Sequence, residues 1–296
     1  TVSTADNGVV DVVYAGDLRG NLWKFDLGAS AASGWGVAYR SGTAAAPLFT
    51  AASGQAITAR PDVTRLPKGG YMVTVGSGRY VDVGDNTAGS TQAMYGIWDN
   101  GAEVALADLQ VQSVVRTAVA GNGKTYRIST HAVGKPADLQ LTGDNVVTLT
   151  DYYAGKKGWR LSLPTSGERV VAEAVVRNGR LVLSTLIPST AACSFGGDGW
   201  IMEVDIFTGN RIAALDLNND NVVGSADLID SNVPSGVQVG SVPAAATIVR
   251  RPPQPGVASA PCAEYKLINT SDGSIVRVGG SCGRVPSRRA SWEQLQ

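Results

Sequence analysis

One plan recurs along the sequence and constrains the fold more than any other feature. Residues 14–26 and residues 200–215 each hold a short apolar strand that ends at an acidic residue, Asp17 or Asp205, and a glycine turn then leads to the next strand. Residues 22–27 alternate between apolar and polar side chains, which is the period-two pattern of a half-buried strand. We therefore predict an all-β protein made of many short strands.

Further strand pairs flank turn signals through most of the chain. The clearest turn is Asn178 and Gly179, the strongest short hairpin signal, between predicted strands at 169–177 and 180–187. The other predicted strands are residues 9–15, 22–27, 57–63, 71–76, 92–99, 126–132, 146–153, 159–163, 199–205, 210–215, 262–268 and 274–279. Residues 28–56 and 231–261 are predicted to be loops, and residues 104–119 a short helix followed by a strand.

Repeated strand–turn–strand units of this kind build propeller blades of the quinoprotein type. A blade holds four strands in about 40–45 residues. The 296 residues therefore have room for at most about seven blades. Because the predicted loops are long, we expect roughly four or five blades.

Composition excludes several classes of function. The 25 Lys and Arg residues balance the 25 Asp and Glu residues, so no net field favours nucleic acid or an anionic membrane. No apolar run reaches the roughly 18 residues that a membrane-spanning helix needs. The chain shows no signal peptide and starts abruptly in sequence that already resembles a folded domain, so we expect a fragment of a longer protein.

The three cysteines are an odd number, so they do not all pair within the chain. Cys262 and Cys282 flank a predicted hairpin and are placed to form a disulfide, which implies an oxidising compartment. Cys193 is then free, or it pairs with one of the other two instead. The sequence leaves this connectivity open.

Residues 216–227 have the pattern of a twelve-residue calcium-binding loop. Oxygen-bearing side chains stand at positions one, three, five and twelve, and position seven supplies its backbone carbonyl. The predicted ligands are Asp216, Asn218, Asp220, Val222 and Asp227. Position six, normally Gly, is Asn221, which tolerates a positive φ, and Gly224 at position nine leaves that ligand to a water.

A second interpretation of the same loop needs no metal. Asn and Asp also favour solvated turns, because their side chains hydrogen-bond the nearby backbone. Calcium is a hard cation that takes roughly 6–8 oxygens, and five positions of the loop match one register, so we favour a Ca²⁺ site. Position twelve is Asp rather than Glu, as in dockerin modules. Dockerins, however, carry two such loops on helices, and this chain has one loop in a β-rich setting.

The sequence contains only weak signals of an enzyme. No Gly-x-Ser-x-Gly motif is present, and His131, on a predicted strand, is expected to be packed or solvated. Residues 121–125 hint at a phosphate loop, but Ala118 stands where that motif requires Gly, which favours a hairpin turn. Paired carboxylates for glycoside cleavage cannot be recognised from spacing alone. We predict no enzymatic activity, with a quinoprotein-like dehydrogenase as the alternative, although the sequence lacks a regular series of docking tryptophans.

One long motif at residues 13–27 is followed in order by shorter motifs at residues 58–61, 76–80, 95–99, 187–189, 193–209 and 289–295. In this order the motifs resemble the PilY-type tip adhesins of type IV pili, and residues 13–27 resemble the most recognisable blade of that family. The resemblance implies that residues 1–296 are the C-terminal part of a modified, seven-bladed, quinoprotein-like β-propeller, with earlier blades upstream and a closing segment at residues 262–296.

The same resemblance implies a function at the cell surface. PilY-type proteins are secreted through the periplasm and outer membrane to the pilus tip, where pilins or minor pilins and a host or abiotic surface are the expected partners. The implied roles are pilus assembly, control of extension and retraction, twitching motility and adhesion, with calcium opposing retraction through the loop at 216–227. Gly224 departs from the family pattern because it lacks a carboxylate, and the chain has no Arg-Gly-Asp, so integrin-type adhesion does not transfer to it. A purely structural adhesive propeller without a calcium switch is the alternative.

Overall fold

The computed structural model describes residues 1–2, 9–66, 69–87, 89–130, 155–191, 196–251 and 262–282. Within these residues the chain is all-β, and its only helical segments are four short 3-10 turns. These turns are η1 (Ala32–Gly34), η2 (Val83–Asn86), η3 (Leu106–Asp108) and η4 (Ser225–Asp227). None of the helical segments found there has the length or apolar character to cross a membrane.

The strands form four larger sheets and one small hairpin. The first sheet contains β1 (Val12–Gly16), β2 (Asn21–Asp26), β3 (Gly36–Val37) and β6 (Phe49–Thr50), beside the hairpin of β4 (Tyr39–Ser41) and β5 (Ala44–Ala46). The second sheet has the order β10 (Gln110–Gln112), β13 (Gly158–Ser162), β9 (Ala93–Asp99), β8 (Tyr71–Gly76) and β7 (Asp62–Arg65).

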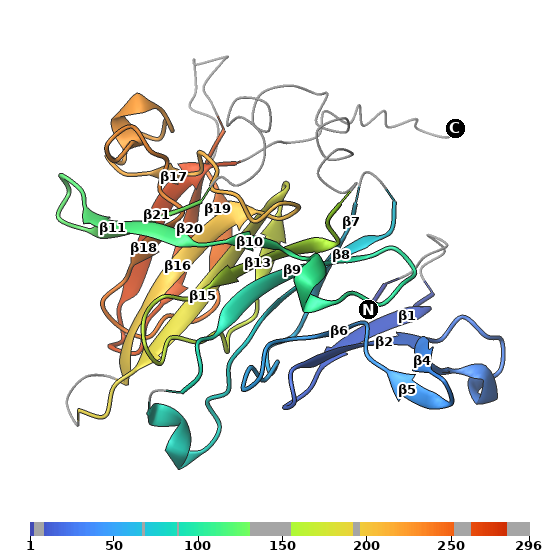
Figure 1. The fold of residues 1–296 in the computed structure, drawn as a ribbon. Coiled ribbons are helices and arrows are strands. Elements are labelled where there is room, and N and C mark those ends of the chain that lie inside the picture. Colours follow the sequence, from blue (N-terminus) through green and yellow to red (C-terminus); the bar gives the residue numbers. More distant parts are fainter. Residues whose placement is uncertain are drawn as a thin grey trace, which may run out of the picture.

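The remaining two sheets come from the second half of the sequence together with one earlier hairpin. The third sheet has the order β11 (Val114–Val119), β12 (Thr125–Ser129), β18 (Gly236–Gln238), β16 (Gly197–Asp205), β15 (Arg180–Pro188) and β14 (Val175–Arg177). The fourth sheet has the order β17 (Leu215–Asp216), β21 (Ile275–Ser281), β20 (Ala263–Asn269) and β19 (Thr247–Arg250). Figure 1 shows the sheets following one another across the molecule, from β1 and β2 at lower right to β20 and β21 at left.

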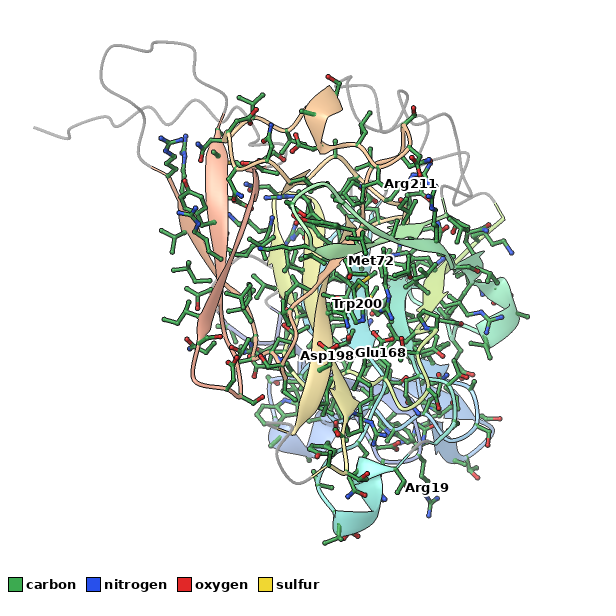
Figure 2. All side chains as sticks on the ribbon, turned by 90° about the vertical axis from the view of Figure 1, so that its left-hand side faces the viewer. Arg19, Met72, Glu168, Asp198, Trp200 and Arg211 are labelled. Carbon is green, nitrogen blue, oxygen red and sulfur yellow. A yellow bond between two sulfur atoms is a disulfide. The ribbon has the colours of Figure 1, made fainter. Side chains whose placement is uncertain are left out.

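Successive sheets pack against each other through three apolar clusters. One joins the first and second sheets, one the second and third, and one the third and fourth, with core residues such as Leu22 and Tyr95, Met72 and Trp200, and Ile201 and Ile268 respectively. Met72 and Trp200 lie in the interior of the molecule in Figure 2. The two inner sheets thus contribute to two clusters each, and the two outer sheets to one cluster each. Packing of neighbouring sheets in this way gives short β-strands a shared hydrophobic core.

A tryptophan of the second sheet also docks on a turn of the third sheet. The Trp159 indole donates to the Ile206 carbonyl at 2.9 Å. Its ring leaves no room beside Gly209, where an added Cβ would come within 2.5 Å of the indole. Gly209 has φ +67°, so both its backbone and its missing side chain suit this turn. The predicted acidic strand end and glycine turn therefore form a contact between neighbouring sheets.

Several predicted elements are confirmed. The Asn178–Gly179 turn has positive φ at both residues, 50° and 78°, and joins β14 to β15. Residues 121–124 lie in the turn between β11 and β12, and Thr125 is the first residue of β12, as expected for a hairpin. A disulfide joins Cys262 and Cys282, one of the pairings left open by the sequence. Cys193, His131 and the strand predicted at 146–153 lie outside the described residues.

Other predictions are wrong in detail. The segment 28–56, expected to be a loop, contributes β3 to β6, and the segment 231–261 contributes β18 and β19. These strands are two to four residues long. Backbone pairing defines them, not their own side-chain pattern: β3, β6, β18 and β19 pair with longer strands, and β4 and β5 pair with each other. Of the strand predicted at 210–215, only Leu215 lies in a strand, β17, which pairs with β21 through two residues, and Arg211 makes an isolated bridge to Val204. The short helix expected in 104–119 is the 3-10 turn η3.

Candidate calcium site

The predicted calcium loop runs between two defined elements. It begins in β17, whose Leu215 and Asp216 pair with Gly280 and Gly279 of β21, and it ends in the turn η4. In Figure 1 this segment lies near the top of the molecule beside β17. The fourth sheet therefore fixes the first ligand position, and the 3-10 turn fixes the last.

Asp216 and Asp227 form the buried base of the loop, with 6% and 2% of their surfaces exposed. The Oδ2 atom of Asp216 accepts a hydrogen bond from the Asn221 amide at 2.9 Å. The two oxygens of Asp227 accept from the amides of Leu217 at 2.6 Å and Gly224 at 2.7 Å. Backbone donors thus draw residues ten positions apart into one closed loop.

The other three predicted ligands, Asn218, Asp220 and Val222, are exposed at the outer end of the loop. The Asn218 side chain accepts from the Asp220 amide at 3.1 Å, and Asp220 accepts from the Val222 amide at 2.7 Å. Asn221, predicted to tolerate a positive φ at position six, has φ +71°. These local bonds are Asx turns, so they also match the interpretation that needs no metal.

The base of the loop gathers carboxyl groups that have no cation partner among the described residues. Asp216 Oδ1 is buried and has no hydrogen-bond partner. Burial raises the pKa of the Asp216 carboxyl. Hydrogen bonds from the Asn221 and Asn219 amides lower it in part, and the negative charges of Asp227 and Asp220 raise it, so the net shift of the pKa is upward. In the described part of the chain, no ion pair joins a Lys or Arg to any of these three carboxylates.

The donor set suits calcium in chemistry, although it is not assembled as a finished metal centre. All side-chain donors are oxygens, the type of ligand that a hard divalent cation takes. A buried carboxylate oxygen without a partner is the kind of atom that a cation satisfies. Across the described residues, however, no three His, Cys, Asp or Glu side chains are gathered closely enough to ligate one ion.

Sequence reasoning missed the residues that surround the loop. The Tyr265 hydroxyl of β20 donates to the Asn221 side chain at 2.7 Å, and the Asn122 amide donates to the Leu217 carbonyl at 2.8 Å. An added Cβ on Gly279 would lie 3.2 Å from Asp216 Oδ2. Only the paired glycines 279 and 280 within a strand carried a signal, since glycine inside a strand often marks the close approach of another group.

Comparison with known proteins identifies the class of fold. Residues 2–125 match the family model of the PilY1 beta-propeller domain. A crystal structure of the Pseudomonas aeruginosa PilY1 C-terminal domain superposes on 96% of this chain with a TM-score of 0.68 and 25% identity, and the match covers 60% of that structure. The chain is therefore an all-β protein with the fold of the PilY1 propeller domain, as predicted. The number of blades stays a prediction.

Sequence relatives point to the same proteins. The chain is 29% identical over its whole length to a type IV pilus biogenesis factor PilY1 homolog of Xylella fastidiosa, and 28% identical over 80% of its length to PilY1 of P. aeruginosa. These matches span 21% and 24% of the two relatives, so the chain corresponds to about a fifth to a quarter of their length. The predicted resemblance to the PilY-type proteins is confirmed. Its relatives are named for pilus biogenesis and not for a reaction.

Proposed function

We propose that this chain is the calcium-binding propeller part of a type IV pilus protein that acts in pilus biogenesis. The likeness to PilY1 proteins supports the pilus assignment. The observation that carries the calcium assignment is the buried, unpartnered Oδ1 of Asp216 at the base of a loop with further carboxylates at Asp220 and Asp227. The ligands would be Asp216, Asn218, Asp220, Asp227 and the Val222 carbonyl, with water at position nine.

The loop has the properties of a switch in local order. Its three carboxylates repel one another, and its outer ligands are exposed and held only by short-range Asx bonds. Bound Ca²⁺ would supply the positive charge that these oxygens lack. Asn218 and Asp220 would then turn inward from the exposed end of the loop, while Asp216 and Asp227 stay in place at its base. Such a change orders a surface that a partner can recognise.

The wider role follows the relatives. We infer that the propeller works outside the cell at the pilus tip, where it contacts pilins or minor pilins and acts in extension, retraction, twitching motility and surface adhesion. The proposal includes no catalysis. A propeller with the same adhesive role but no calcium switch is the competing outcome, and it is favoured by the Asx turns that already close the loop.

The test is a calcium titration of this chain by isothermal calorimetry after removal of divalent ions with a chelator. We expect one saturable site. Asp220→Asn keeps an oxygen that can accept from the Val222 amide but removes one ligand charge. Because ligand charge tunes the affinity of such loops, this change should weaken binding at least about tenfold.

The matched control is Asp82→Asn. Asp82 is also an exposed aspartate whose Oδ1 accepts a backbone amide at 2.7 Å, from Val83, but it is the N-cap of η2, at the opposite end of the molecule from the loop in Figure 1. Its replacement should leave calcium affinity unchanged. A titration with no heat of binding, or equal affinity in Asp220→Asn, would leave only the adhesive propeller without a switch.

A further inference from the structure

The hairpin of β20 and β21 is the surface on which the calcium loop is held. Its strands pair through seven residues each, and its turn lies at residues 270–274. The opposite, open end is closed by the Cys262–Cys282 disulfide and by a hydrogen bond from the Cys282 amide to the Cys262 carbonyl at 3.0 Å. Open ends of hairpins fray first, so a covalent bond there has its largest effect on local order.

The calcium loop attaches next to this closed end. Gly280 of β21 pairs with Leu215, Gly279 pairs with Asp216, and the Ser281 amide donates to the Ala214 carbonyl at 3.1 Å. These contacts stand one to three residues before Cys282 along the chain. Order at the disulfide is therefore transmitted directly to the backbone of the first ligand.

Register places three groups of this assembly on one face of the fourth sheet. Tyr265 pairs with Gly279, and Gly279 pairs with Asp216, so the three residues form a row across adjacent strands. The missing side chain at Gly279 leaves space for the Asp216 carboxylate. At the edge of the same row the Tyr265 hydroxyl holds Asn221, the residue with positive φ in the middle of the loop.

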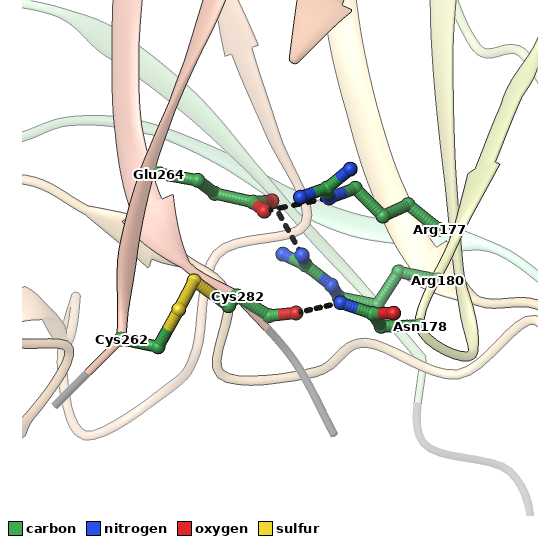
Figure 3. The surroundings of a disulfide bond; sticks show 6 residues. All are labelled: Arg177, Asn178, Arg180, Cys262, Glu264 and Cys282. Carbon is green, nitrogen blue, oxygen red and sulfur yellow. Dashed lines mark hydrogen bonds and ion pairs between the residues drawn. A yellow bond between two sulfur atoms is a disulfide. The ribbon is translucent and has the colours of Figure 1, made fainter. Parts of the chain in front are cut away.

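The hairpin is in turn fixed to the third sheet beside the disulfide, as Figure 3 shows. The Asn178 side chain donates to the Cys282 carbonyl at 2.7 Å. The guanidinium groups of Arg177 and Arg180 both pair with the buried carboxylate of Glu264. The closed end of the hairpin is thus a junction of two sheets, and displacement of Cys282 would disturb both.

We propose that the disulfide-closed β20–β21 hairpin pre-orders the calcium loop, with Tyr265 as a positioning residue, so that loss of the Cys262–Cys282 bond weakens calcium binding. The inference rests on the proposed calcium function and adds to it a dependence on oxidation. Reduction by a dithiol transfers two electrons and two protons to the bridge. It yields two cysteine thiols, while the dithiol becomes a disulfide.

The experiment is calcium calorimetry on the oxidised chain, on the Cys262→Ser/Cys282→Ser double variant and on Tyr265→Phe. If the ordered loop falls to about a tenth of the population without the disulfide, the apparent affinity falls about tenfold. Loss of the single hydroxyl hydrogen bond in Tyr265→Phe should lower affinity about fivefold. Thermal unfolding followed by circular dichroism shows whether each variant is folded.

Tyr39→Phe is the matched control. Its hydroxyl also makes one side-chain hydrogen bond, to Asp99 at 2.7 Å, but Tyr39 lies in the small β4–β5 hairpin. It should bind calcium like the unchanged chain. If the unchanged chain binds no calcium, the proposed function fails. If it binds calcium and both the disulfide and Tyr265 variants bind equally well, the proposed role of the β20–β21 hairpin is overturned while the calcium function stands. Should the double variant not fold, Tyr265→Phe alone decides.

Discussion

The segments 79–87 and 216–227 have the same local design at opposite ends of the molecule, near the bottom and the top of Figure 1. Each contains a 3-10 turn with a buried aspartate at its third residue, Asp85 in η2 and Asp227 in η4. Each of these aspartates accepts two backbone amides, from Val81 and Asp82 or from Leu217 and Gly224.

The two segments differ in where the positive charge comes from. Asp85 pairs with Arg79 at 2.8 Å, and Arg169 lies beneath that turn and donates to its carbonyls. Among the described residues no cation pairs with Asp216, Asp220 or Asp227. Two guanidinium groups contact the first turn, whereas no Lys or Arg of the described residues pairs with the carboxylates of the second turn. An acidic turn alone therefore does not indicate a metal, and the lack of a cation partner at the second turn among the described residues is one of the observations behind the proposed calcium site.

The largest expected effect is on stability in calcium. At a calcium concentration about one hundred times the Kd, binding should stabilise the unchanged chain by about 2.7 kcal/mol. Asp216→Asn, which removes the unpartnered oxygen at the base of the loop, should abolish most of this gain. Asp85→Asn should retain all of it, because Arg79 and Arg169 already serve that turn. Urea unfolding with and without calcium measures the gain, and equal gains in both variants would erase the contrast.

The next effect should be independent of calcium. Arg169 is buried, and its guanidinium donates to the carbonyls of Arg79, Asp85 and Thr87. Arg169→Ala leaves these acceptors without a partner and should lower the free energy of unfolding by about 2 kcal/mol. The loss should be the same in calcium and in chelator, as measured by urea unfolding. A loss that calcium reversed would mean that this turn also binds a cation.

The contacts of these two turns could not be predicted equally well from the sequence, for physical reasons. Ligand spacing in 216–227 is a short-range pattern, so the five candidate residues and the positive φ of Asn221 were visible without a structure. Hairpins around Asn178 and Gly179 were visible for the same reason. Arg169 acts on a turn more than eighty residues earlier, and Tyr265 acts on Asn221 across 44 positions. Such contacts depend on how the sheets pack, and no local pattern specifies them.

A substitution at Gly224 tests the ligand positions assigned to the calcium loop. An added Cβ at Gly224 meets no atom within 4 Å, and its φ of −153° is open to any residue. Gly224→Asp places a carboxylate at position nine and should tighten calcium binding about tenfold, because affinity rises with ligand charge. Gly84→Asp is the control, since Gly84 is equally open but lies in η2. Calorimetry should show no calcium binding gained from it, and an unchanged affinity in Gly224→Asp would contradict the assigned register.

The smallest expected effect concerns Arg79, the cation that pairs with Asp85 in the segment 79–87. Hydrogen bonds from the Val81 amide and then from the Arg79 side chain lower the pKa of Asp85 from 3.8 to about 2. Because the folded-state pKa lies below the unfolded value, the stability from this carboxylate is complete above pH 3.8 and is lost as pH falls through about 2.

Arg79→Gln removes that cation and should raise the pKa of Asp85 toward, but not up to, its ordinary value, since the amides of Val81 and Asp82 still donate to it. The acid-induced loss of stability should then begin at a higher pH. The carboxyl ¹³C shift of Asp85 across an acid titration measures the change directly. Arg79 is half exposed, so water and salt screen the pair and the effect on stability at pH 7 should be slight. A titration midpoint that stayed at about 2 in Arg79→Gln would show that backbone amides alone complete this turn. A turn could then balance its charge without a cation, and the missing cation in 216–227 would no longer argue for calcium.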